Sequence, residues 1–578
     1  MSTLPIADHA LLSDRHSAAL VTRDGSVVWL CFPRFDSESV FAALLDDEAG
    51  HWSIRPSSPF TASRAYVDDT MALRTTFRAA DGILELVDAM DLGESSDPHS
   101  LGEQAPHTLL RGVRCESGRV DVEMVYRPRP EYGLVVPVSS EVPGGIVATG
   151  GSSRLTLSMP GRMPDTDIHS GDIHAGDIRA GDIRAGDIRA GDIQAQGEIS
   201  LRFTLEAGQS RYFALQGSRL GQRRPSVYTQ GRIAAALDTI VASWQRWSSA
   251  HQNYDGPWRD LVWQSGRVLQ ALSYRPTGAI VAAATTSLPE EVGGERNWDY
   301  RYSWVRDASF TMRALWVAAC PDEAHEFFGF MTAAAAHPSP GRHLQIMFGI
   351  GGEHDLAERV LPQMSGWRGS APVRVGNGAW NQPQLDVYGE LLDAAFRLRE
   401  QLGEIEPATR TFLIAQADAA ASQWEQPDNG IWEVRGQPRH FLHSKLMWTG
   451  SAARRAVFYC VPSGPRMCWR PYLVPDRPTH RFILYQRGYI NPFIESKRSH
   501  PCAVPSVVTV AARSPGPAAG STSTASWPMF RPLSVAPATR HEEPRHSPRP
   551  GRSRPVRLHR VLRAGDLGLN RSYRPIPS

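Results

Sequence analysis

The chain has 578 residues, of which 41% are hydrophobic and 21% charged, so it is long enough for more than one globular domain. Its formal net charge of +2 indicates neither a nucleic-acid-binding nor a membrane-binding protein. This average conceals an asymmetry, because residues 448–578 carry 21 Lys and Arg against 5 Asp and Glu, which leaves 41 against 55 in the rest. An acidic body is therefore followed by a basic tail.

The six cysteines are scattered without a C-x-x-C spacing, which indicates neither a structural zinc site nor a disulfide scaffold. The first residues lack a basic segment followed by an apolar run, and no apolar run approaches the roughly 20 residues of a membrane-spanning helix. We therefore predict a cytoplasmic protein with no cofactor, no metal and no membrane partner.

The pattern of residues 1–225 predicts a β-sandwich. Short runs rich in β-branched residues are separated by turns, and Asp24-Gly25 between two such runs predicts a hairpin. Further predicted strands include 75–77, 83–88, 120–126 and 212–216.

A repeat interrupts this pattern, since Gly171–Ala195 consists of five tandem pentamers of the form Gly-Asp-Ile-x-Ala. A period of five fits neither a solenoid nor a heptad, so residues 167–196 are interpreted as an expanded loop between two strands. Calcium binding by its aspartates is an alternative, but the glycine-rich nonapeptide pattern of such sites is missing.

From about residue 226 the apolar residues recur every three or four positions, which predicts helices. We interpret 226–254 as a linker helix and 255–447 as a domain of paired helices whose loops carry the unusual residues. The predicted helices are 232–249, 258–272, 311–319, 322–336, 386–402 and 408–424.

The stretch Asn297–Asp307 holds four aromatic residues with Asp and Arg between them. Aromatic faces pack on sugar rings, and carboxylates and guanidinium groups bind sugar hydroxyls in bidentate fashion. The alternative is the start of an amphipathic helix whose aromatic residues face the core. We interpret the stretch as a loop that contributes to a sugar site.

Residues 290–307, Glu-Glu-Val-Gly-Gly-Glu-Arg-Asn-Trp-Asp-Tyr-Arg-Tyr-Ser-Trp-Val-Arg-Asp, resemble the signature of glycoside hydrolase family 15, which contains glucoamylases, glucodextranases and trehalases. The resemblance runs from about Pro5 to about Met447, and the opening residues are similar to the family's trehalase-like N-terminal domain. It implies that residues 255–447 belong to an (α/α)6 barrel, here incomplete at its C-terminal end.

Glycoside hydrolysis requires two carboxyl groups across the scissile bond, one of which protonates the leaving oxygen. The resemblance assigns this general acid to Glu433, which follows Trp432 in a loop opened by Asn429-Gly430. The alternative is a surface glutamate at a helix start. No general base is found.

The resemblance also implies a set of substrate-binding residues. Arg306 and Asp307 would bind hydroxyls, while Gln384 and Asp386 would be polar groups of the platform loop, although Asp386 could equally be the N-cap of the following helix. The full predicted set is Tyr300, Trp304, Arg306, Asp307, Trp380, Gln384, Asp386 and Trp432.

Residues 448–578 contain 19 of the 44 prolines and a single lysine, and they cannot continue a helical domain. We interpret this tail as disordered or out of frame, in preference to a basic tail that binds nucleic acid. The predicted function is inverting hydrolysis of α-glucosidic bonds, in trehalose or at α-glucan ends. Because no general base is found, we expect little or no hydrolysis by this chain. The alternative is a non-catalytic sugar-binding relative or the product of a frameshifted pseudogene. The predicted partner is a small-molecule or oligosaccharide substrate, and the sequence does not indicate an oligomeric state.

Overall fold

The computed structural model describes residues 4–159, 197–317, 321–335, 343–402 and 405–447, together with the strand pair at 482–483 and 509–510. Residues 1–465 form one compact unit and residues 466–578 a second. The pentapeptide repeat and most of the basic tail, for which we predicted a loop and a disordered or out-of-frame segment, lie outside the described residues. Within the described part, no helix combines the length and apolar character needed to cross a bilayer.

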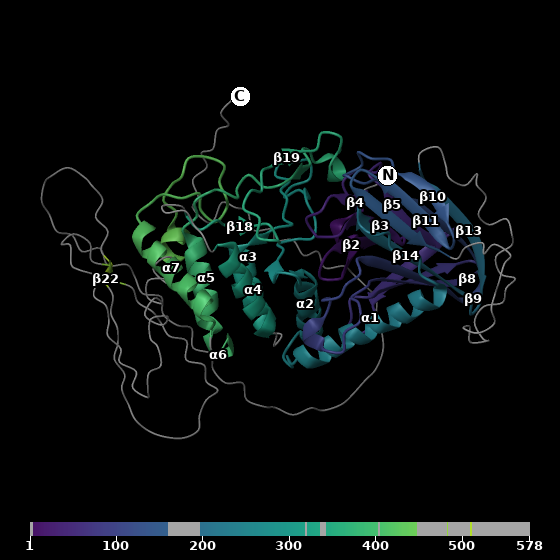
Figure 1. The fold of residues 1–578 in the computed structure, drawn as a ribbon, viewed down its shortest axis with the longest axis horizontal. Helices are drawn as coiled ribbons and strands as arrows, with labels where there is room; N and C mark the ends of the chain where they lie inside the picture. The colour runs from purple at the N-terminus through teal and green to yellow at the C-terminus, as the bar shows by residue number, and fades with distance from the viewer. Residues whose placement is uncertain are drawn as a thin grey trace, which may run out of the picture. The chain divides into compact units, whose positions relative to one another are not determined.

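The N-terminal part of the first unit is a 14-stranded antiparallel sheet, shown in purple to blue in Figure 1. Along Leu73–Ala79 buried side chains alternate with more exposed ones, as expected for a strand with one face on the core. The strands are β1 (His9–Ser13), β2 (Ala18–Thr22), β3 (Ser26–Cys31), β4 (Ser39–Phe41), β5 (His51–Pro56), β6 (Phe60–Tyr66), β7 (Leu73–Ala79), β8 (Gly82–Met90), β9 (Thr108–Arg127), β10 (Val138–Val142), β11 (Gly145–Gly150), β12 (Ser153–Ser158), β13 (Ile199–Glu206) and β14 (Ser210–Arg219).

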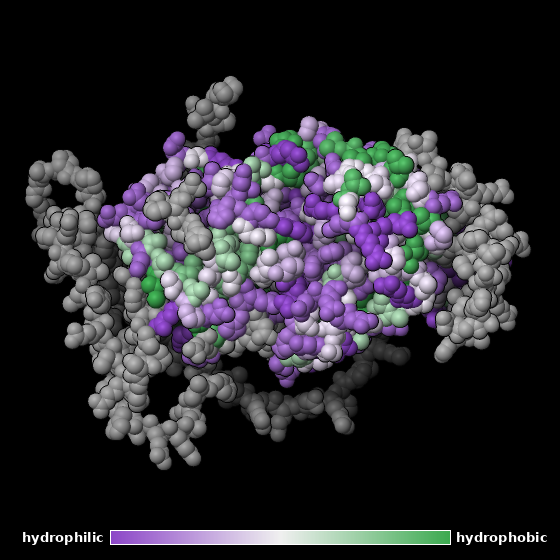
Figure 2. All heavy atoms as spheres, viewed as in Figure 1, coloured by the Kyte–Doolittle hydropathy of each residue, from purple (hydrophilic) through white to green (hydrophobic). Residues whose placement is uncertain are grey.

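The long strand β9 joins two layers. Its first half pairs with β8 and β14, and its second half pairs with β5 and β13. One hydrophobic cluster draws buried residues from both halves, including Trp52 of β5, Leu86 of β8 and Phe213 of β14. On the face in Figure 2, hydrophobic patches gather over the β10 and β11 end of this domain, where Leu134, Val136 and Val138 are exposed.

The predicted Asp24-Gly25 hairpin is present between β2 and β3, with Val21 opposite Val27. Gly25 has a φ of +76°, and a Cβ atom at this position would lie 2.5 Å from the carbonyl oxygen of Ile54. Both facts require glycine there.

Helix α1 (Gln230–His251) follows the sheet and packs along β14, β9 and β8 (Figure 1). The Thr229 hydroxyl caps it by accepting from the Arg232 amide. Its apolar stripe, which includes Ile233, Leu237 and Trp244, is buried in a cluster with Leu110 of the sheet. The segment predicted as a linker helix therefore covers a face of the β domain.

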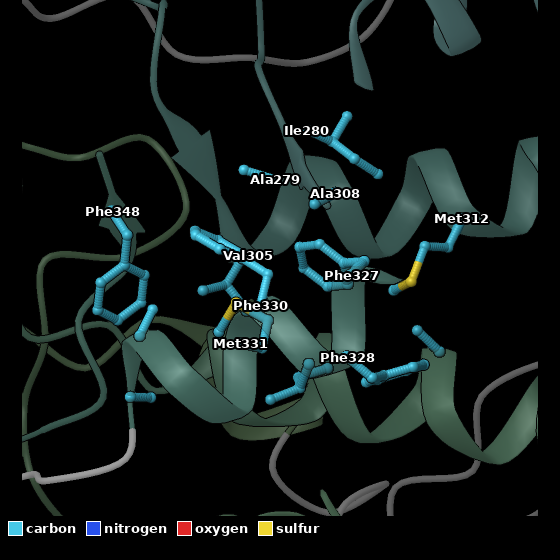
Figure 3. Close-up of a cluster of buried hydrophobic side chains, with 14 of the residues drawn as sticks. Ala279, Ile280, Val305, Ala308, Met312, Phe327, Phe328, Phe330, Met331 and Phe348 are labelled. Atoms are coloured by element: carbon cyan, nitrogen blue, oxygen red, sulfur yellow. The ribbon is translucent and has the colours of Figure 1, made fainter. Parts of the chain in front are cut away.

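The following region is helical, and its helices pack on one another: α3 contacts α4 and α5, and α7 contacts α4 and α5. Val305 and Met312 of α3 meet Phe327 and Met331 of α4 in one buried cluster (Figure 3). The helices are α2 (Arg259–Ala271), α3 (Val305–Val317), α4 (Pro321–Ala334), α5 (Asp386–Arg397), α6 (Arg399–Leu402) and α7 (Pro407–Gln423), and residues 442–447 are also helical.

Short elements shape the loops between these helices. The described residues between 4 and 447 include three two-stranded ribbons and three short 3-10 helices. The ribbons are β15 (Ser273–Tyr274) with β16 (Ala279–Ile280), β17 (Ser303–Trp304) with β18 (Met347–Phe348), and β19 (Arg359–Val360) with β20 (Arg374–Val375); the 3-10 helices are η1 (Ile6–Asp8), η2 (Pro98–Ser100) and η3 (Trp367–Gly369). In the second unit, β21 (Phe482–Ile483) pairs with β22 (Thr509–Val510).

A large antiparallel β domain followed by a helical region is therefore confirmed. The prediction that 297–307 is wholly loop is wrong at its end, because Ser303 and Trp304 pair with β18 and α3 already begins at Val305. Arg306 and Asp307 thus lie in the first turn of a helix. The cause is tertiary, since the apolar side of this turn packs against α4.

Candidate functional site

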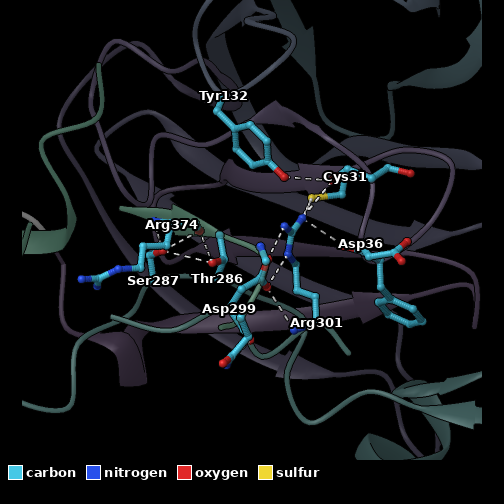
Figure 4. A network of polar contacts seen from close by, with 12 residues as sticks. Cys31, Asp36, Tyr132, Thr286, Ser287, Asp299, Arg301 and Arg374 are labelled. Atoms are coloured by element: carbon cyan, nitrogen blue, oxygen red, sulfur yellow. Dashed lines mark hydrogen bonds and ion pairs between the residues drawn. The ribbon is translucent and has the colours of Figure 1, made fainter. Parts of the chain in front are cut away.

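The 297–307 stretch divides its residues between the interior and the site. Asn297, Asp299 and Arg301 are buried, with exposed fractions of 1% or less. Arg301 forms a bidentate ion pair with Asp299 at 2.9 and 2.7 Å and donates to the carbonyl oxygen of Ser37 at 2.9 Å (Figure 4). These polar residues therefore join the helical region to the β domain, rather than facing a sugar.

Trp304 and Arg306 reach Glu433, which lies 129 and 127 positions further along the chain. The Trp304 indole N–H donates to Glu433 Oε1 at 2.7 Å, and Arg306 Nη2 donates to the same oxygen at 3.3 Å. Arg306 also donates to the carbonyl oxygen of Ile431 at 3.1 Å and pairs with Asp307 at 3.3 Å. The structure thus brings the predicted acid together with three predicted substrate-binding residues.

The loop that carries Glu433 is anchored at its beginning. The Leu385 amide donates to the Asp428 carboxylate at 2.9 Å, and the Asn429 amide donates to the carbonyl oxygen of Pro383 at 2.9 Å. After the turn at Gly430, Glu433 itself adopts a left-handed φ of +53°. Non-glycine residues adopt this conformation at an energetic cost and often at functional positions.

The environment of Glu433 favours its protonated form. Burial raises the pKa of this carboxyl above its ordinary value, although Arg306 and the Trp304 hydrogen bond oppose the rise. Its side chain is 18% exposed, so it remains open to solvent on one side. A carboxylic acid with a raised pKa and partial access is suited to donate a proton to a bound molecule.

Aromatic side chains surround this carboxyl to different degrees. Tyr300 and Trp304 lie 5.6 Å apart between ring centroids, and Trp380 packs against the same small cluster. Trp432, in contrast, is 84% exposed. Rings that are half-buried or exposed beside a carboxyl could stack on the apolar face of a sugar.

Gln384 and Asp386 are almost completely buried, and in the described part of the chain neither side chain makes a hydrogen bond to Trp304 or Glu433. Asp386 is the first residue of α5 and makes no capping bond, so the alternative that it is an N-cap is wrong. Its carboxylate instead faces His443 at 3.6 Å, because burial against the 442–447 segment, and not the helix end, decides its direction.

Sequence reasoning missed two groups near this site. Glu390 lies four residues after Asp386, and burial raises its pKa to about 8, with Asp386 adding to the rise. Trp298 lies under the guanidinium groups of Arg374 and Arg435, at 4.8 and 4.5 Å. The i, i+4 spacing of Asp386 and Glu390 was a visible signal for the first group. The Trp298 contact had no visible sequence signal, because Arg374 and Arg435 come from distant loops.

This arrangement can hold a small polar ligand and protonate it. Glu433 could supply the proton, Arg306 and Asp307 could supply charged hydrogen-bond partners, and the tryptophans could supply flat surfaces. The roles themselves stay predictions, because the geometry brings these groups together without a ligand among them.

Comparisons with known families agree with this geometry. Residues 256–459 match the family described as "Glycosyl hydrolases family 15", a little beyond Met447, where we expected the resemblance to end. Residues 1–175 match the family described as "Trehalase-like, N-terminal".

Three known proteins are similar to this chain to different degrees. A trehalase of Mycolicibacterium smegmatis is 37% identical over 457 residues, covering 77% of this chain and 64% of the relative. Trehalase 1 of Sulfolobus acidocaldarius is 33% identical over 439 residues, covering 75% of this chain and 67% of the relative. A solved structure of a bacterial glucoamylase complexed with acarbose is 10% identical with a TM-score of 0.46, over 78% of this chain and 66% of that chain.

The chain spans 64% of the length of the mycobacterial relative. The match to the archaeal relative nevertheless covers two thirds of that relative at 33% identity. This chain therefore belongs to glycoside hydrolase family 15 and carries a trehalase-like N-terminal domain.

Proposed function

We propose that this chain binds an α-glucoside at the Glu433 site and that Glu433 is the general acid of an inverting hydrolase. The observation that carries the proposal is the Glu433 carboxyl held between the Trp304 indole N–H and the Arg306 guanidinium. Protonation of the glycosidic oxygen by Glu433 would allow a water to attack from the opposite face of the ring, at a carboxyl separation of roughly 6.5–9.5 Å.

In this proposal Arg306 and Asp307 bind hydroxyls of the terminal glucose, while Tyr300, Trp304, Trp380 and Trp432 form its aromatic walls. Gln384 and Asp386 support the site from behind, because both side chains are buried. Trehalose is the preferred substrate, since several relatives are named trehalases; maltose and α-glucan ends are the alternatives.

We further propose the domain boundaries 1–225, 226–254, 255–447 and 448–578, with 255–447 as part of an (α/α)6 barrel. A base for the water is not assigned among the described residues. We therefore expect this chain to bind sugar but to hydrolyse it slowly, since general-base assistance contributes about 10²–10⁴-fold to rate. A cytoplasmic location and the absence of nucleic-acid and membrane partners stay predictions from the sequence.

Two measurements on the full chain test the proposal. Quenching of tryptophan fluorescence by trehalose and by maltose reports binding, and release of glucose reports hydrolysis. Trp432→Ala should weaken trehalose binding at least tenfold, whereas Trp258→Ala, which removes another exposed tryptophan far along the chain, should not.

Absence of saturable binding of either sugar would contradict the sugar site. If glucose is released, Glu433→Gln should abolish it while Glu425→Gln, an exposed control in the preceding segment, should not. Release at ordinary enzymatic rates would contradict only the expectation of slow hydrolysis, and NMR of the first product, which should be β-glucose, then decides the inverting mechanism.

A further inference from the structure

Behind the Glu433 site lies a three-residue cluster, of which only Asp386 enters the proposed function, as a supporting residue. Asp386 and Glu390 lie four residues apart on α5, and both side chains are 1% exposed. His443, from the helical segment 442–447, directs Nε2 toward them, at 3.6 Å from Asp386 Oδ2 and 3.6 Å from Glu390 Oε1. One donor atom from each residue lies within 4.8 Å of the others.

These donors lack hydrogen-bond partners. All four carboxylate oxygens of Asp386 and Glu390, and Nε2 of His443, make no hydrogen bond to any part of the chain that the structure describes. A buried carboxylate without partners is costly, and buried charges in proteins are commonly paired or bound to metal ions.

The neighbouring charges do not neutralise the pair. Arg306 acts on both carboxyls, but it also serves Asp307 and Glu433, which are acidic too. Asp428 adds further negative charge near Asp386. Four carboxyl groups, those of Asp386, Glu390, Asp307 and Glu433, interact with the single Arg306 guanidinium. The cluster therefore attracts an additional cation.

We propose that Asp386, Glu390 and His443 bind a divalent first-row transition ion of the Zn²⁺ type. Carboxylate oxygen and imidazole nitrogen are its usual ligands, at about 2.0–2.2 Å. Ligands of such an ion in tetrahedral geometry lie roughly 3.3–3.6 Å apart, which agrees with the two separations of 3.6 Å from His443 Nε2. Water would complete the coordination.

No metal was predicted from the sequence. His443 lies 57 positions after Asp386 and 53 after Glu390, so the three residues form no recognised motif. The ion has a structural role. It connects α5 to the 442–447 segment, in which Lys445 Nζ also donates to the carbonyl oxygens of Trp424 and Gln426. Binding to the folded state alone would raise stability by mass action.

The test uses the full chain, stripped with a chelator and titrated with Zn²⁺ against a chromophoric competitor, with the melting temperature measured in parallel. The variants are Glu390→Gln and His443→Gln. The matched controls are Glu400→Gln on α6 and His440→Gln, an exposed histidine three residues before His443. None of these readouts requires sugar binding, so the result is independent of the proposed function.

We expect one Zn²⁺ per chain in the wild type and both controls, with a rise in melting temperature. Glu390→Gln and His443→Gln should each weaken this binding at least tenfold and remove the rise. Equal binding by all five proteins would place the ion elsewhere, for example on the cysteines of the 448–578 tail, and would overturn the proposal. So would a Glu390→Gln variant that is stabilised without zinc, because the two acids would then share a proton instead.

Discussion

Replacing Arg301 by methionine tests whether the buried half of the 297–307 stretch is structural. Arg301 and Asp299 have exposed side-chain fractions of 1% and 0%, so the substitution leaves an uncompensated carboxylate in the interior. Removing one partner of a buried ion pair costs about 3–5 kcal/mol. The hydrogen bond to Ser37, which ties the helical region to the β domain, is lost as well.

The assay is urea unfolding followed by tryptophan fluorescence. The control is Arg202→Met, which removes the arginine of an exposed pair with Glu123, a pair worth about 0–1 kcal/mol. The double variant Asp299→Asn with Arg301→Met should recover part of the loss, because the buried charge is gone. If Arg301→Met shifts the unfolding midpoint no more than Arg202→Met does, the buried pair is not the structural link described here.

Three other outcomes are expected. Trp304→Phe removes a hydrogen bond that lowers the pKa of Glu433, so that pKa should rise in carbon NMR of labelled glutamate, and an unchanged value would argue against the contact. Burial raises the pKa of Asp14 from 3.8 to about 7, so the proton is held more tightly in the folded state. The free energy of unfolding that this proton contributes is present at low pH. It decreases by up to about 4 kcal/mol as pH rises from about 4 to 7. Asp14→Asn should therefore flatten the dependence of the urea midpoint on pH, and an equal slope would contradict it. Trp432→Ala should leave the melting temperature unchanged, since the side chain is 84% exposed; a drop of several degrees would mean that it packs against the tail.

Local rules were sufficient for much of the architecture. The short run at 75–77 and the Asp24-Gly25 turn predicted a strand and a hairpin, because strand propensity and turn geometry are properties of a few neighbouring residues. The 3.6-residue period likewise located α1 and α7 to within a few positions. The resemblance of residues 290–307 to a family signature indicated which loops to examine.

Only the tertiary structure shows that residues of the same type within one motif have different positions, some buried and some at the site. Arg301 and Arg306 are five positions apart. Arg301 is buried and donates to the Ser37 carbonyl oxygen of the β domain, whereas Arg306 donates to Glu433. The same holds for Asp386, which could have capped its helix but turns toward His443. Sequence periodicity indicates which face of a helix or strand is apolar, but it does not indicate which distant segment covers that face. Contacts across 57, 129 or 264 positions are decided by the packing of whole elements, and these contacts determine which polar residues are buried as links and which remain open to a ligand.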